Sequence, residues 1–109
     1  MKKTIAIDFD GVIHKYSKGW QDGKIYDEPV EGALEGLMEL YAKGYDIVIF
    51  TTREEDGSVN RWIAEQYHKY FPNQEIFAFR VTNKKPPAII YIDDRGIRFT
   101  NWKDILNYF

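Results

Sequence analysis

Short apolar runs alternate with amphipathic stretches along this chain, and this alternation is the strongest constraint on its fold. Residues 4–9, 46–50 and 88–92 are almost continuously apolar, as expected of strands that are covered on both faces of a sheet. A weaker run at 76–79 predicts one further strand. Because helical patterns separate the runs, we expect an α/β protein with a mostly parallel sheet.

The first amphipathic stretch, residues 30–43, carries apolar side chains at the three- and four-residue spacing of a helix. Pro29 suits the first turn of this helix, and Gly44 suits its C-terminal cap. Gly32 and Gly36 each lower helix propensity by roughly 1 kcal/mol. Since they lie four residues apart, we interpret them as allowing a close approach of this helix to the sheet.

Two further helices are predicted from their polar N-terminal residues. One runs from Asp56 or Ser58 to about Tyr70, and a short one follows Asn101. The 109 residues of the chain have the size of a single domain. Residues 14–28 are rich in turn-forming and aromatic residues. We refer to them as the flap, because they are expected to fold over the end of the first strand.

Composition excludes several classes of protein. The chain has no Cys, which rules out disulfides, thiolate nucleophiles and zinc sites built on sulfur. Fifteen Lys and Arg face seventeen Asp and Glu, so no global positive field attracts nucleic acid, although a local basic patch is compatible with this balance. No apolar run approaches the roughly 18 residues of a membrane span, and Asp8 and Asp10 interrupt any leader. We therefore expect a cytoplasmic protein.

Polar side chains follow three of the predicted strands at the point where each strand ends. They are Asp8 and Asp10, Thr51 and Thr52, and Asp93 and Asp94. In open α/β sheets the carboxyl ends of the strands form the ligand-binding edge, so these groups are expected to converge there. Two carboxylates about 4 Å apart repel by roughly 4 kcal/mol at an effective dielectric constant of 20. A hard cation relieves this repulsion, and oxygen-only ligands favour Mg²⁺.

Four segments of the chain resemble the four motifs of the haloacid dehalogenase superfamily of phosphotransferases. They are TIAIDFDGVI, DIVIFTTRE, NKKPPA and AIIYIDDRG, in the order that the family shows. The resemblance implies a Rossmann-like three-layer sandwich with a mostly parallel central sheet. The gaps between the motifs are too short for the cap domain that many members carry. A capless member with an open site is therefore expected, with the flap as its only cover.

The resemblance also assigns catalytic roles to individual residues. Asp8 would be the nucleophile that forms an aspartyl-phosphate, and Asp10 would be the general acid and then the general base. Thr51 would donate a hydrogen bond to a phosphoryl oxygen. Lys85 would neutralise charge shared by the phosphoryl group and the nucleophile. Lys85 is preferred because it directly precedes a proline, and Lys84 is the runner-up.

The resemblance implies a magnesium site as well. The Asp8 carboxylate, the Asp10 backbone carbonyl and the Asp93 carboxylate would hold the ion. Asp94 would assist through a metal-bound water or by orienting the loop. The positive charge of the ion is what allows an anionic nucleophile to approach an anionic phosphoester.

Several residues next to the motifs are weaker candidates. Thr52 and Arg53 follow the second motif and are candidate substrate contacts. Arg53 and Arg95 could each bind a second phosphate, but ion pairing with nearby acids is the favoured interpretation. His14 either touches substrate or belongs to the flap. The flap aromatics either stack on a base or pack the flap down, and packing is favoured; they are Tyr16, Trp20 and Tyr26.

These features predict a Mg²⁺-dependent phosphohydrolase that acts on a phosphomonoester through an aspartyl-phosphate. The substrate would be a phosphorylated small molecule or a phosphorylated nucleic-acid end. One alternative is a receiver-like phospho-acceptor signalling domain, which the early position of the Asp-x-Asp disfavours. Another is a non-catalytic binding protein that retains the site. The C-terminal aromatics either form a homo-oligomer interface or close the core; they are Phe99, Trp102, Tyr108 and Phe109.

Overall fold

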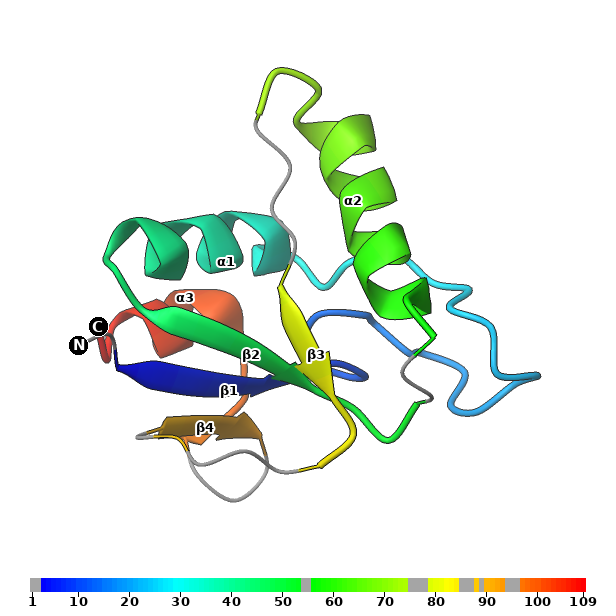
Figure 1. Ribbon diagram of the computed structural model, residues 1–109, viewed down its shortest axis with the longest axis horizontal. Helices are drawn as coiled ribbons and strands as arrows, with labels where there is room; N and C mark the ends of the chain where they lie inside the picture. Colours follow the sequence, from blue (N-terminus) through cyan, green and yellow to red (C-terminus); the bar gives the residue numbers. More distant parts are fainter. Residues whose placement is uncertain (1–2, 54–55, 75–78, 85–87, 89, 94–96) are drawn as a thin grey trace.

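A parallel five-stranded sheet with strand order β3-β2-β1-β4-β5 forms the centre of the molecule (Figure 1). The computed structural model describes residues 3–53, 56–74, 79–84, 88, 90–93 and 97–109. Its strands are β1 (Thr4–Asp8), β2 (Asp46–Phe50), β3 (Arg80–Thr82), β4 (Ile90–Asp93) and β5 (Ile97–Arg98). Its helices are α1 (Ala33–Ala42), α2 (Ser58–Tyr70) and α3 (Trp102–Leu106). The predicted α/β class with a parallel central sheet is confirmed, and no cap domain interrupts the described elements.

The core is built on one face of the sheet and the sheet is covered on both. Ile7 of β1 and Ile49 of β2 are neighbours in register and are fully buried in a cluster that includes side chains of all three helices. Ala6 and Val48 point to the opposite face and are only 2% and 0% exposed. Burial on both faces explains why these strands read as continuous apolar runs in the sequence.

Helix α1 begins three residues later than its apolar spacing predicts. Gly32 adopts a left-handed conformation with φ of 81°, so it lies at the N-terminal boundary instead of inside the helix. Gly36 is inside α1, and its predicted close approach is real, but the partner is not the sheet. A Cβ at this position would lie 2.3 Å from a ring carbon of Trp102 in α3. The absence of a side chain at Gly36 therefore lets the indole ring of Trp102 pack directly against α1.

The predicted N-terminal cap of α3 at Asn101 is confirmed, whereas the cap of α2, expected at Asp56 or Ser58, is Gly57, which has no side chain to accept a hydrogen bond from the helix. The Asp56 carboxylate accepts the backbone N–H of Ser58 at 3.0 Å, just before α2. The Asn101 side chain accepts the backbone N–H of Asp104 at 2.9 Å and caps α3. Both contacts satisfy N–H groups that have no partner within the helix itself.

The third strand was expected at residues 76–79, and this expectation is wrong for its described part. Phe79 is not in a strand, because its N–H and its carbonyl bond to the Asn60 side chain of α2 at 3.1 and 2.8 Å. The strand that pairs with β2 is instead Arg80–Thr82, where one apolar residue stands between two polar ones. Residues 76–78 lie outside the described part of the chain. No strand was predicted at the position of β5.

No helix in the described residues is both long enough and apolar enough to cross a membrane. The described helices have 10, 13 and 5 residues and are components of the core.

Replacing Gly36 by Ala is expected to destabilise the protein. Alanine adds about 1 kcal/mol of helix propensity, but its methyl group would collide with the buried ring of Trp102. We expect a net loss of about 1–3 kcal/mol in the free energy of unfolding, measured by urea denaturation. The exposed Glu39→Ala change in the same helix is the control and should stay within about 0.5 kcal/mol of the wild type. A Gly36→Ala variant as stable as the wild type would contradict the packing described here.

Candidate active site

The acidic residues at the ends of β1 and β4 line a common pocket of about 360 Å³ at the carboxyl edge of the sheet. Asp8, Asp10 and Asp93 are its acidic lining residues. They converge because β1 and β4 pair in parallel, with Ile7 opposite Ile92, so both strands end at the same edge. The remaining residues that line the pocket are Gly11, Val12, Arg98 and Phe99.

The chain leaves β1 through a tight turn that fixes these groups. The backbone N–H of Phe9 donates to the Asp8 carboxylate at 2.9 Å, and the N–H of Gly11 donates to the carbonyl of His14 at 2.7 Å. Gly11 has a φ of 85°, which glycine adopts without strain. The Trp102 indole N–H donates to the Val12 carbonyl at 2.9 Å and anchors the turn to α3.

The Asp10 carboxylate is held by two nitrogen donors from different parts of the chain. Arg53, just after β2, contacts it through two parallel bonds, from Nε to Oδ2 and from Nη2 to Oδ1, both at 3.0 Å. Nδ1 of His14 lies 2.8 Å from Oδ1. Both carboxylate oxygens therefore accept hydrogen bonds, and the fork of Arg53 fixes the plane of the carboxylate.

The hydrogen bonds of His14 define its tautomer. Its Nε2 lies 3.0 Å from the backbone N–H of Asp27, which can only donate. Nε2 is thus the acceptor, and Nδ1 carries the proton that it donates to Asp10. The ring is fully buried and stacks on Phe9. His14 is consequently an internal support of the flap and does not face the pocket, which answers the question that the sequence left open.

The pKa of Asp10 is lowered from its ordinary value of 3.8 by these contacts. Partial burial alone would raise the pKa. The hydrogen bonds from His14 and Arg53, together with the positive charge of Arg53, outweigh burial because they stabilise the ionised form. Asp10 is therefore a carboxylate in this arrangement.

Arg53 forms the ion pair that was the favoured interpretation of this residue. Its side chain is only 6% exposed, and that of Asp10 is 20% exposed. The third nitrogen, Nη1, donates to the carbonyl of Gly23 in the flap at 2.7 Å. Pairing of Arg53 with an acid was predicted, but Asp10 was not predicted as the partner, because nothing in the sequence relates positions 10 and 53.

The threonines after β2 do not line the pocket. Thr51 is 2% exposed, and its hydroxyl oxygen accepts the backbone N–H of Arg53 at 3.1 Å. Thr52 is exposed. Lys84 is also exposed, and its N–H donates to the Thr82 hydroxyl at 3.1 Å. Among the remaining predicted residues, Lys85, Asp94 and Arg95 lie outside the described part of the chain.

Arg98 and Phe99 line the pocket and were not predicted as site residues. Arg98 belongs to β5, whose two residues are too few for a periodic signal. The available signal was an apolar–basic–apolar triplet shortly after the paired acids at 93–94.

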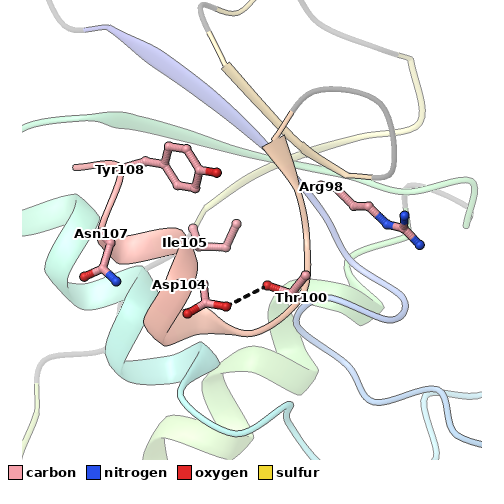
Figure 2. Close-up of a pocket in the computed structure, with 6 residues that line it drawn as sticks. All are labelled: Arg98, Thr100, Asp104, Ile105, Asn107 and Tyr108. Carbon is pink, nitrogen blue, oxygen red and sulfur yellow. Dashed lines mark hydrogen bonds between the residues drawn. The ribbon is translucent and has the colours of Figure 1, made fainter.

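Arg98 also borders a second, larger hollow of about 550 Å³ beside α3 (Figure 2). Asp104, which lines that hollow, accepts a hydrogen bond from the Thr100 hydroxyl at 3.1 Å.

The donor set of the acidic pocket suits magnesium by its chemistry. Asp8 and Asp93 offer carboxylate oxygens, and the Asp10 carbonyl is a further oxygen donor on the same turn. Mg²⁺ typically takes one or two carboxylates and keeps several waters. Within the described residues, no three His, Cys, Asp or Glu side chains form a metal-binding group. A site of two carboxylates and a carbonyl does not need a third side chain.

Comparisons with known proteins support the fold but indicate no function. No family model matches the chain, and no curated protein matches it. A solved structure of a conserved protein from Bacteroides thetaiotaomicron is similar, with a TM-score of 0.64 and 24% sequence identity. The similarity covers 96% of this chain and 87% of that protein. At this identity the likeness shows a shared α/β architecture.

Replacing Asp10 by Asn should destabilise the protein in a pH-dependent way. The change leaves the buried guanidinium of Arg53 without its counter-charge, which typically costs about 3–5 kcal/mol. Because the pKa of Asp10 is lower in the folded state, its contribution is present above about pH 4 and is lost as the pH falls through the folded-state pKa. Urea denaturation at neutral and acidic pH should therefore show a difference between variant and wild type that shrinks in acid.

The exposed Asp22→Asn change in the flap provides the matched control. Its free energy of unfolding should differ from that of the wild type by no more than about 0.5 kcal/mol at neutral pH. An Asp10→Asn deficit of equal size at neutral and acidic pH would argue against the ion pair as its source.

Proposed function

We propose that this protein is a Mg²⁺-dependent phosphohydrolase that acts on phosphomonoesters through an aspartyl-phosphate on Asp8. The observation that carries the proposal is the shared pocket of Asp8, Asp10 and Asp93 at the carboxyl edge of the parallel sheet. The four segments that resemble the haloacid dehalogenase motifs support it from the sequence. The substrate would be a phosphorylated small molecule or a phosphorylated nucleic-acid end.

The first half of the reaction uses Asp8 as a nucleophile. A carboxylate oxygen of Asp8 forms a bond to phosphorus while the bond from phosphorus to the leaving oxygen breaks. The leaving oxygen takes a proton from Asp10 and departs as an alcohol. Asp8 suits this role because it stands at the end of the central strand, with its carboxylate fixed by the Phe9 N–H.

The second half hydrolyses the aspartyl-phosphate. A water oxygen bonds to phosphorus, the bond from phosphorus to Asp8 breaks, and Asp10 takes the proton of the water. The ionised Asp10 of this structure is the form that the second step requires. The proton-donating step needs the protonated form, which the hydrogen bonds from Arg53 and His14 disfavour.

Charge compensation is the main requirement of such a reaction, because both the nucleophile and the phosphoester are anionic. A magnesium ion held by Asp8, Asp93 and the Asp10 carbonyl would supply positive charge where the phosphoryl oxygens bind. Lys85 would add an ammonium group, and Asp94 would assist through a metal-bound water or by orienting the loop. These two roles derive from the motif resemblance.

A non-catalytic binding protein is the second candidate, and one observation favours it. The Asp10 carboxylate accepts hydrogen bonds from Arg53 and His14, and the hydroxyl of the buried Thr51 accepts a backbone hydrogen bond. A protein that only binds a phosphorylated ligand would tolerate this arrangement. Turnover by the purified protein separates the two candidates.

The wild-type protein is expected to hydrolyse an aryl phosphate in the presence of Mg²⁺ and to lose this activity in excess EDTA. Release of the phenolate is measured by absorbance, and release of phosphate is measured in parallel. Asp8→Asn should lower kcat on the order of 10³-fold or more, because the amide is a poor nucleophile. Asp104→Asn, outside the acidic pocket, is the control. Full activity in chelator, or wild-type turnover by Asp8→Asn, would refute the proposal.

The two neighbouring lysines offer a test of the motif assignment. Lys85→Ala should reduce kcat by about 10²-fold or more, as expected when a donor to the transferring group is removed. Lys84→Ala should retain most of the activity, because Lys84 is exposed and follows β3 at the sheet edge. Steady-state kinetics on the same aryl phosphate measure both effects. The reverse ranking would move the catalytic role to Lys84.

A further inference from the structure

We propose that Arg53 is a positioning residue that holds the flap (residues 14–28) against the strand ends and at the same time orients Asp10. This inference rests on the proposed function for its catalytic half. Its structural half, the attachment of the flap, rests only on the contacts of Arg53 described here.

The three nitrogens of the Arg53 guanidinium serve two different parts of the molecule. Nε and Nη2 form the fork that holds Asp10, at the end of the central strand. Nη1 donates to the Gly23 carbonyl, near the tip of the flap, at 2.7 Å. One planar guanidinium group thus joins the Asp10 carboxylate to the flap tip. A movement of the flap tip would therefore change the orientation of this carboxylate. Lysine lacks the planar fork and cannot make the same set of contacts.

The environment of Arg53 strengthens these contacts. The guanidinium carbon lies 5.9 Å from the ring centres of Phe9 and Tyr16 and 6.0 Å from that of Trp20. Two of these rings belong to the flap. A cation among aromatic rings and away from water is attracted to the rings and is costly to separate from its counter-ion. The aromatic rings of the flap therefore shield the Arg53–Asp10 ion pair from water, and Arg53 in turn holds the flap.

The two ends of the flap are joined to each other independently of Arg53. The backbone N–H of Lys15 donates to the Glu28 carbonyl at 3.0 Å, and the N–H of Val30 donates to the Ile13 carbonyl at 2.8 Å. His14 adds a third attachment at this base, through the N–H of Asp27. By contrast, the contact from the Gly23 carbonyl to Arg53 joins the tip to the strand ends. Loss of Arg53 is therefore expected to release the tip and leave the base in place.

The catalytic half is tested with Arg53→Lys and Arg53→Ala, and with the exposed Arg61→Ala of α2 as the matched control. Misplacement of a catalytic group by about 1 Å costs up to about 10²-fold in rate. We expect Arg53→Lys to lower kcat for an aryl phosphate about 10–100-fold, with KM changed by less than about threefold. Added guanidinium ion at millimolar concentration should restore part of the kcat of Arg53→Ala, but should not activate the wild type or Asp8→Asn.

The structural half is tested by limited proteolysis with trypsin, which needs no phosphatase activity. Lys18 and Lys24 are exposed in the flap. Cleavage after these residues, identified by mass, should be at least several-fold faster in Arg53→Ala and Arg53→Lys than in the wild type and Arg61→Ala. Thermal unfolding of each variant is measured first, and Arg53→Lys carries the test if Arg53→Ala does not fold.

The outcomes separate this inference from the proposed function. A wild-type protein that hydrolyses no phosphomonoester refutes the proposed function and, with it, the catalytic half, while the proteolysis still decides the structural half. An active wild type with an Arg53→Lys variant of unchanged kcat overturns the positioning role alone. Loss of activity that guanidinium does not restore, together with unchanged cleavage in the flap, also overturns it.

Discussion

The parallel pairing of β1 with β2 on one side and β4 on the other is the constraint on which the site depends. Because all three strands run in the same direction, their polar ends emerge at one edge of the sheet. Asp8 and Asp93 thereby line one pocket although 85 positions separate them in the sequence (93 minus 8). The helices that cover the sheet hold this edge in place, and the Trp102 indole ties the turn after Asp10 to α3.

The second organising interaction is the ion pair between Asp10 and Arg53. It links the end of β1, the segment after β2 and the flap through one guanidinium group. Such a pair is costly to desolvate, and its stability depends on every donor finding an acceptor. His14 completes the arrangement by donating to Asp10 and accepting from Asp27. The group proposed for proton transfer is thus also a structural link, which ties its chemistry to the position of the flap.

Much of the fold was accessible from patterns of apolar residues. β1 and β2 were predicted because their residues are buried on both faces, and the cap at Asn101 was visible as a polar residue before a helical stretch. β3 was misplaced because an edge strand alternates and because Phe79 satisfies its backbone through the Asn60 side chain. The start of α1 was misplaced because apolar spacing does not reveal backbone conformation. Gly32 has a positive φ and marks the boundary of α1, but the spacing of apolar residues continues across it.

For the candidate site, the sequence by itself determined that acids follow the first and fourth strands, because short-range patterns reveal where a buried strand ends. It also predicted residues 14–28 as a cover near the first of these strands. Only the tertiary structure decided that Arg53 pairs with Asp10, that His14 is a buried donor and that Thr51 is buried and does not line the pocket. These are contacts between residues whose spacing follows no local periodicity. Their partners are set by how the sheet and the flap pack, which depends on the whole chain at once.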